Sequence, residues 1–384
     1  MRFATPLRCA CAALLLCATA CFADPPLPLQ PGERPVPGST EAELWYGMDQ
    51  AEKDIRRSPI LVRDPQLNAY VQHVVCNVTG DYCKDLRLYI VDVPVFNAQM
   101  APNGVVLVFT GALLRMHDEA ELAVVLGHEF AHYRQRHGLQ YWDKAKHTSA
   151  VFASFGVGGG LVGGLAQIVG MASLFHYSRD FEREADRLGF QTAVAGGYDP
   201  QAGVRLWSRM LREEKASKSS HFIVFASHPK TGERLEDVRA AAAAIAPGDY
   251  HDGREAYRAA VRPFLAHWLD EELARRTYDT SIQVIDDLRD GAPAGAAGTL
   301  DFYLAQAYRQ RRGEGDAATA GKLYRDAITH PDAPAAAWRE VGLDLRQNGQ
   351  RAAAADALHH YLQLAPQADD RAFIEQYLAE LEKP

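Results

Sequence analysis

The five residues HEFAH at positions 128–132 restrict the fold of this 384-residue chain more than any other segment. Two histidines four residues apart share a face when the backbone is helical. In a helix the imidazoles of His128 and His132 can reach one metal ion, and Glu129 lies one step round, close to a metal-bound water. The apolar run Leu122–Leu126 directly before them favours a buried helix. The segment therefore predicts a helical metal site of the HExxH type.

A later acidic cluster supplies candidates for the remaining metal ligand. Catalytic zinc needs three protein ligands and one open position. In a helix predicted from about Arg179 to Ala195, Glu182 and Asp186 are four residues apart and share a face, whereas Glu184 points elsewhere. On its own this cluster would be a solvated charged face. Beside an HExxH helix, it becomes a source of the third ligand.

The rest of residues 41–250 predicts many helices and few strands. Apolar and β-branched runs predict strands at Leu86–Val93 and Val105–Thr110, and the turn at 102–104 precedes the second one. Predicted helices are Thr40–Arg57, Pro65–Val75, Asp118 or Glu119 to His137 with Gly138 as its stop, Arg179–Ala195, Pro200–Lys215, and an Ala-rich helix to Ala244. The fold class is therefore α+β, mostly helical with a small sheet.

Residues 251–384 have helical spacing throughout and predict an all-α helical-repeat domain. Tetratricopeptide-like spacing is met by Trp338, Val341, Gly342, Leu345, Ala354, Leu358, Tyr361 and Pro366, and in an earlier copy by Leu304, Ala305, Tyr308, Ala320, Tyr324 and Ala327. A weaker copy lies between Trp268 and Leu288. Such repeats stack helix pairs and leave a concave face. The alternative is an unspecialised helical tail.

The first 23 residues are typical of an export signal. Two arginines precede an apolar run from Cys9 to Ala20 that is too short to span a membrane. Either the signal is cleaved after Ala23, or Cys21 is lipidated after a degraded lipobox. The Pro-rich residues 24–40 predict an extended lead-in.

Four of the six cysteines lie in that signal, and Cys76 and Cys83 remain. An isolated pair in an exported protein favours a disulfide that closes a short loop, and the alternative is two buried free thiols. A zinc role for the pair is not expected, because no second Cys or His pair lies nearby at ligand spacing.

The charge balance restricts the partners. A net charge of −8 argues against nucleic-acid binding, which needs a basic face. The uncharged stretch 148–175 is long enough to span a bilayer. We expect instead two small-residue helices or a mobile cover beside the site, because a span would separate Glu182 from His128 across the membrane.

The HEFAH segment and the Glu-x-x-Ala-Asp spacing at 182–186 resemble the HtpX-related zinc metallopeptidases, most closely the exported bacterial branch of the BepA type, over roughly residues 41–240. The resemblance implies a gluzincin-like domain with one zinc ion per chain, and it implies these roles: His128, His132 and Glu182 as ligands, Glu129 as the catalytic base, and Asp186 as a group that orients a ligand.

A third element of that family appears here as His228-Pro229 followed by Arg234. By resemblance, His228 could approach the zinc as a fourth ligand and close the site without substrate. Arg234 or His228 could also help to stabilise the oxyanion. His137 recurs in the family too, but helical geometry puts it off the ligand face, so we predict a structural role for it.

These observations predict a zinc metalloendopeptidase that acts on proteins or peptides in the bacterial periplasm, peripheral to or lipid-anchored at the outer membrane. The resemblance implies a role in envelope protein quality control and contacts between the repeats and outer-membrane assembly proteins. The strand 105–110 could pair with an extended substrate. The alternative is a chaperone or binding module with a closed, rarely used zinc site.

Overall fold

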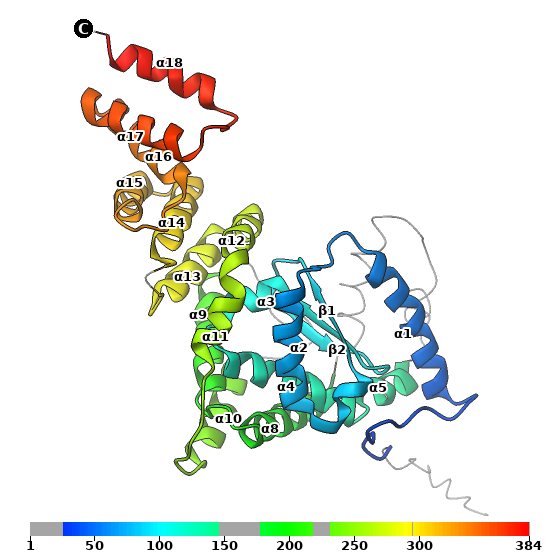
Figure 1. Ribbon diagram of the computed structural model, residues 1–384. Helices are drawn as coiled ribbons and strands as arrows, with labels where there is room; N and C mark the ends of the chain where they lie inside the picture. Colours follow the sequence, from blue (N-terminus) through cyan, green and yellow to red (C-terminus); the bar gives the residue numbers. More distant parts are fainter. Residues whose placement is uncertain (1–25, 146–176, 218–230, 294, 384) are drawn as a thin grey trace, which may run out of the picture.

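The computed structural model describes residues 26–145, 177–217, 231–293 and 295–383, which form many helices and one small sheet (Figure 1). This is the α+β class that the sequence predicts. The predicted signal with Cys21, the uncharged stretch 148–175 and His228 lie outside the described residues. Within the described ranges, none of the helices combines the length and apolar character that crossing a membrane requires.

Most of the predicted helices lie close to their expected positions, whereas the helix Thr110–Arg115 was not predicted. Ser39 and Ser178 cap α1 and α8 through their hydroxyl oxygens, which accept backbone N–H groups. The helices of the first part are α1 Thr40–Arg57, α2 Pro65–Thr79, α3 Thr110–Arg115, α4 Glu119–Arg134, α5 His137–Ala145, α8 Arg179–Ala195, α9 Ala202–Ala216 and α10 Thr231–Ala243. Those of the second part are α11 Arg254–Val261, α12 Leu265–Ala274, α13 Tyr278–Arg289, α14 Ala297–Arg311, α15 Asp316–Ala327, α16 Ala335–Gln347, α17 Arg351–Leu364 and α18 Arg371–Leu381.

The sheet consists of β1 (Arg87–Val91), β3 (Val105–Phe109) and β2 (Ala98–Met100), in that spatial order. β3 pairs in parallel with β1 and antiparallel with β2, so it is the central strand. All five of its residues are buried, which is typical of a strand covered on both faces. The expectation that strand 105–110 could pair with a substrate is therefore wrong. The short β2, which the sequence analysis missed, forms an edge instead.

Helices cover both faces of the sheet. Val106 and Val108 point into a core that includes α2 and α4. The alternate residues Val105, Leu107 and Phe109 point to the other face, where α1 and α5 pack. The helix that carries the HEFAH segment therefore lies directly against the sheet (Figure 1).

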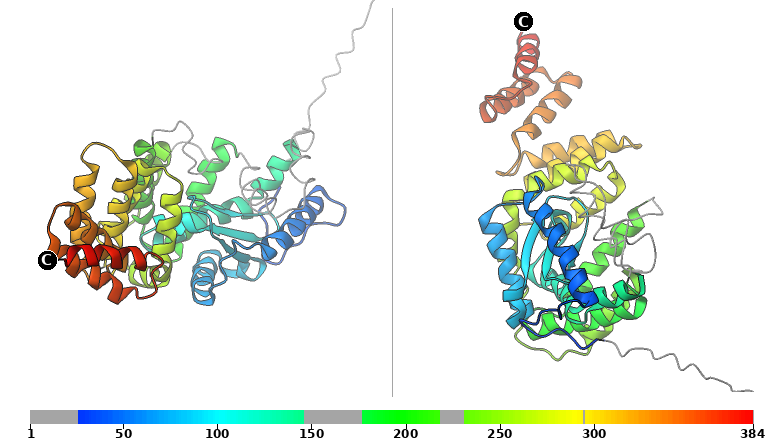
Figure 2. Two further views of the ribbon diagram at one scale, coloured as in Figure 1. Left: turned by 90° about the horizontal axis from the view of Figure 1, so that it is seen from above. Right: turned by 90° about the vertical axis from the view of Figure 1, so that its right-hand side faces the viewer.

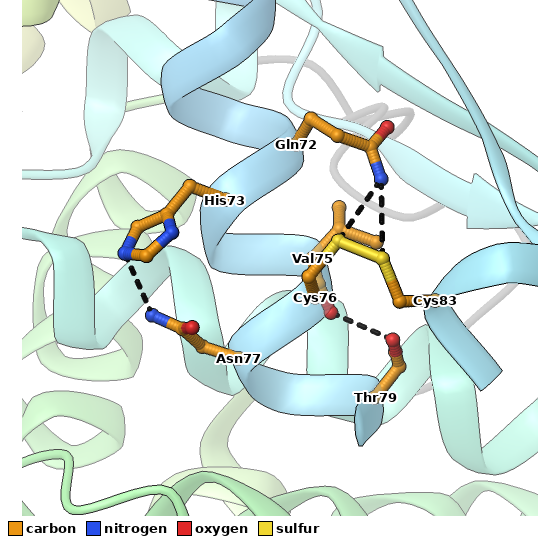
Figure 3. The surroundings of a disulfide bond; sticks show 7 residues. All are labelled: Gln72, His73, Val75, Cys76, Asn77, Thr79 and Cys83. Atoms are coloured by element: carbon orange, nitrogen blue, oxygen red, sulfur yellow. Dashed lines mark hydrogen bonds between the residues drawn. A yellow bond between two sulfur atoms is a disulfide. The ribbon is translucent and has the colours of Figure 1, made fainter. Parts of the chain in front are cut away.

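Cys76 and Cys83 are joined by a disulfide, as the sequence predicts (Figure 3). The bond links the last turn of α2 to the 3₁₀ turn Gly80–Asp85, with the two Cα atoms 4.8 Å apart. The amide nitrogen of Gln72 lies 3.3 Å from the sulfur of Cys76. The bond fixes the chain where it leaves α2 to enter β1.

Helices α11 to α13 pack against helices of the first part. Helices α14 to α18 extend away from the sheet, and the C-terminus lies at their far end (Figures 1 and 2). Helices that follow one another pack together, with close contacts between α13 and α14, α14 and α15, and α16 and α17. Gly342 permits the last of these, because a Cβ atom there would lie 2.6 Å from the Leu358 side chain. The tetratricopeptide assignment of these helices stays a prediction.

A buried ion cluster joins the two parts of the chain. Arg115 at the end of α3 contacts Glu213 of α9 and Glu272 of α12, each through an N···O distance of 2.8 Å. All three side chains are at most 4% exposed. Charges removed from water to this extent are stable only while they remain paired.

Candidate metal centre

Helix α4 forms the floor of the site and is buried over nearly its whole length. Asp118 caps its first turn by accepting a hydrogen bond from the backbone N–H of Glu121. Every residue from Glu119 to Tyr133 is buried, so the helix has no solvent-facing stripe. Surrounding elements therefore hold the HEFAH side chains on all sides.

Helices α4 and α8 approach each other closely at two glycines. A Cβ atom on Gly127 would lie 2.6 Å from the carbonyl oxygen of Gly189, and one on Gly189 would lie 2.5 Å from the backbone nitrogen of His128. Only glycine permits such backbone contact. This approach lets Glu182, at the start of α8, reach the two histidines of α4.

The ligand candidates meet in a buried triangle. The Nε2 atoms of His128 and His132 are 3.1 Å apart. The carboxylate oxygens of Glu182 lie 3.6 Å from Nε2 of His128 and 3.5 Å from Nε2 of His132. All three residues are at most 3% exposed. A tetrahedral zinc ion with bonds of about 2.0–2.1 Å needs ligand atoms about 3.3–3.4 Å apart, so these donors fit it.

The charges at the site also fit a cation. Burial raises the pKa of Glu182, and burial together with the negative charge of Glu182 raises the pKa of Glu129 well above its usual range. Burial lowers the pKa of His128, which keeps the imidazole neutral, as metal ligation requires. A divalent cation between the carboxylates would offset their repulsion.

Asp186 and Arg234 lie behind His128. Nδ1 of His128 is 2.9 Å from Oδ1 of Asp186, and Nε of Arg234 donates to Oδ2 of Asp186 over 3.0 Å. Burial would raise the pKa of Asp186, but Arg234 and His128 hold it well below its usual range. The Arg234 guanidinium also lies 4.0 Å over the Trp207 ring. These contacts favour a supporting role for Arg234 over direct contact with an oxyanion.

The structure corrects the end of the HEFAH helix and the place of His137. Helix α4 ends at Arg134, and α5 begins at His137, so Gly138 lies inside a helix and is not a stop. Between them Arg136 has a φ of 55°, a left-handed conformation that turns the chain. His137 is thereby turned back toward the site, with its Nδ1 atom 2.9 Å from Nδ1 of His132. An uninterrupted helix would have kept the two rings apart.

Aromatic rings just before and within the first turn of α8 stack on these histidines. The ring of Tyr177 stacks on His132 with centroids 4.0 Å apart, and the ring of Phe181 stacks on His137 at 4.2 Å. Nε2 of His137 lies 3.4 Å from a carboxylate oxygen of Glu184. Sequence reasoning missed Tyr177, Phe181 and Glu184 as parts of the site. Helix spacing alone points Glu184 away from the ligand face.

Glu129 lies beside the ligand triangle and has free acceptor capacity. The backbone N–H of Met100 in β2 donates a hydrogen bond to its carboxylate. Within the described part of the chain, the Oε1 atom of Glu129 is buried without a hydrogen-bond partner. The carboxylate can therefore accept a proton from a molecule that enters the site.

The two glycine contacts give a direct test of how the site is assembled. Replacing Gly189 by alanine improves helix propensity by about 1 kcal/mol. We nevertheless expect a net loss of stability of about 1–3 kcal/mol, because the added methyl group would collide with the backbone of α4. Thermal unfolding and metal content should both fall. As the control, Gly232 of α10 has open space around the same added atom. Its alanine variant should be at least as stable as the wild type and hold the same amount of metal.

Comparison with known proteins agrees with this geometry. Residues 61–242 match the model of peptidase family M48. A candidate beta-barrel assembly-enhancing protease of Vibrio cholerae is 30% identical over 273 residues, which cover 62% of this chain and 55% of that protein. The mitochondrial metalloendopeptidase OMA1 of Schizosaccharomyces pombe is 31% identical over 154 residues, 40% of this chain and 45% of that protein.

A third relative is the beta-barrel assembly-enhancing protease of Escherichia coli, 26% identical over 235 residues, which cover 57% of this chain and 48% of that protein. The chain spans about half the length of the curated relatives it matches. The family match contains the whole HEFAH segment, the Glu182 cluster and Arg234. Over residues 61–242, the chain therefore carries a metallopeptidase domain of peptidase family M48.

Proposed function

We propose that this chain is a zinc-dependent metalloendopeptidase that hydrolyses peptide bonds in proteins of the cell envelope, in their quality control. The observation that carries the proposal is the buried triangle of His128, His132 and Glu182, with Glu129 beside it. Two nitrogens and one carboxylate at these distances are a ligand set that zinc favours. The likeness to beta-barrel assembly-enhancing proteases of Vibrio cholerae and Escherichia coli supports the envelope assignment.

The chain's own residues can perform the proton transfers of peptide hydrolysis. His128, His132 and Glu182 would hold the zinc ion, which supplies Lewis-acid polarisation of the scissile carbonyl and a lower pKa for a water molecule. Glu129 takes a proton from the attacking water and passes it to the departing amine. Its buried position keeps other water away from the proton. Asp186 holds the His128 ring in place during the reaction.

The edge strand β2 is the place where a substrate backbone can bind. Asn97 and Ala101 are hydrogen-bonded to β3, so the backbone groups of Ala98 and Met100 between them face away from the sheet. The N–H of Met100 already bonds to Glu129, which puts this edge next to the reacting groups. A substrate held by main-chain hydrogen bonds would be selected by its extended shape more than by its side chains.

Location and partners extend the same proposal. The proposed location is the periplasm, peripheral to the outer membrane or attached to it through lipidated Cys21. The helices after α10 would provide a surface for outer-membrane assembly proteins. A regulatory role for His228 stays a prediction, since that residue lies outside the described ranges.

Metal content and cleavage of casein test the proposal. We expect about one zinc ion per purified chain, with cleavage that a strong chelator abolishes and added zinc restores. Cleavage that survives complete removal of metal would overturn the zinc mechanism. Bound zinc without cleavage of casein or of unfolded envelope proteins would favour the alternative, a chaperone or binding module with a closed site.

A further inference from the structure

We infer that His137 and Glu184 form an outer chain of hydrogen bonds that holds His132 in its metal-binding form, so that His137 is a positioning residue of the site. The inference rests on the proposed metal site and extends it to two residues outside the ligand set. The contacts that carry it are the 2.9 Å separation of the His132 and His137 Nδ1 atoms and the 3.4 Å approach of Glu184 to His137.

The positions of the protons follow from the ligand atoms. Nε2 of His132 faces His128 and Glu182, so Nε2 is the atom that would bind the metal and carries no proton. A neutral imidazole whose Nε2 atom is unprotonated carries its proton on Nδ1. That proton needs an acceptor, and Nδ1 of His137 lies within hydrogen-bond distance. His137 must then carry its own proton on Nε2, the atom that faces Glu184.

Because both histidines are buried, loss of the hydrogen bond between them would cost free energy. His132 is 2% exposed and His137 is fully buried, so water does not readily replace the acceptor. An unsatisfied buried N–H group costs about 1–3 kcal/mol. The alternative tautomer of His132 would satisfy its Nδ1 atom but would put a proton on Nε2, where the metal must bind. The acceptor on His137 therefore selects the form of His132 that can bind zinc.

Ring stacking holds the planes of the two imidazoles. Tyr177 covers the face of His132 with an interplanar angle of 14°, and Phe181 covers His137 at 10°. Both aromatic residues come from the same segment that carries Glu182. Tilting either imidazole out of its plane would break its stack. The stacks therefore hold the two ring planes, and the contact between the two Nδ1 atoms orients the ring edges within those planes.

The two histidine ligands are thus supported in different ways. Nδ1 of His128 meets the carboxylate of Asp186, which Arg234 neutralises within the protein. Nδ1 of His132 instead contacts the imidazole of His137, and His137 in turn contacts the carboxylate of Glu184. The side chain of Glu184 is 40% exposed. This side of the site therefore has a polar connection that leads from a metal ligand to the surface.

Zinc affinity of the purified full chain, measured by competition with a chelator, tests the inference. Outer groups of this kind alter metal affinity by about 10–100-fold. We expect that loss for His137→Leu, which removes the acceptor but fills similar space. His137→Asn should stay within about threefold of the wild type, because its amide oxygen can take the place of Nδ1. Glu184→Ala, at a partly exposed position, should weaken binding by less than about tenfold.

The controls separate this role from packing and from the proposed function. Glu236→Gln removes an exposed carboxylate on α10 and should bind zinc like the wild type. Thermal unfolding of each metal-free variant shows whether it folds. The visible absorption spectrum of the cobalt-loaded protein shows whether the variant keeps the same metal ligands as the wild type. Equal losses in the Leu and Asn variants, or none in the Leu variant, would overturn the inference alone. A wild-type chain that binds no zinc would overturn the proposed function and this inference with it.

Discussion

Replacing Glu129 by glutamine is expected to lower kcat/KM for peptide hydrolysis by about 10²–10⁴-fold while zinc content stays the same. Glutamine has the same shape and can still accept the hydrogen bond from the backbone of Met100. It cannot take a proton from water. The ligand triangle does not include Glu129, so the metal site remains intact. The loss corresponds to about 3–5 kcal/mol of transition-state stabilisation.

The measurement compares hydrolysis of one peptide substrate by the wild type and the variant, with zinc determined on the same samples. Glu236→Gln serves as the matched control, since it makes the same chemical change at an exposed position of α10. A Glu129→Gln protein that retains zinc and cleaves within about tenfold of the wild type would show that another group acts as the base.

The same variant also separates the two candidate functions in the cell. A protein that works by proteolysis loses its biological function with Glu129. A binding module keeps it, because the substitution leaves the fold and the helices after α10 unchanged. Full function of the Glu129→Gln protein in cells would therefore show that the biological role depends on the helices after α10 and not on proteolysis at the metal site.

The sequence predicted helices well where their ends have local signals. Helix α8 begins and ends where predicted, because Ser178 supplies its cap and Gly196 and Gly197 follow its last residue. The end of α4 was predicted wrongly. The chain turns at Arg136, a residue type that rarely adopts positive φ, and Gly138, two residues later, is helical. Ion pairs of Arg136 with Glu33 and Glu41, far away in the sequence, accompany this turn.

Strand pairing was less predictable because it depends on distant partners. β2 has only three residues, too few for a period-two pattern to stand out. Its presence makes β3 a central strand, so the expected substrate edge moved from one strand to its neighbour. The location of β2 beside Glu129 therefore could not be inferred before the pairing of both strands was known.

Spacing predicted the two histidine ligands and the family resemblance selected Glu182 as the third, but the residues that support them were not fully predictable. The four-residue spacing of His128 and His132 fixes a shared helix face without knowledge of the fold. The contact between Gly127 and Gly189 joins two helices about sixty residues apart in the chain, and no local pattern indicates such an approach. His137 was predicted to be structural, but it was placed away from the ligand face for a related reason, since its contact with His132 depends on the turn between two helices.

Replacing Arg115 by methionine is expected to destabilise the junction between the metallopeptidase domain and the later helices by about 3–5 kcal/mol. Methionine fills similar space but leaves Glu213 and Glu272 without their buried cation. Burial already raises the pKa of Glu213, and Arg115 opposes that effect, so its loss would force proton uptake or water entry. The free energy of unfolding, measured in urea at neutral pH, should fall by this amount.

Two further variants separate charge from packing in this cluster. Arg275 also pairs with Glu272, at 3.0 Å, but its side chain is 24% exposed, so Arg275→Met should cost at most about 1 kcal/mol. Combining Arg115→Met with Glu213→Gln and Glu272→Gln removes the uncompensated charges and should recover much of the loss. A triple variant no more stable than Arg115→Met would show that the arginine stabilises the junction by packing alone. In that case the three charges would not be what holds α12 against α3 and α9.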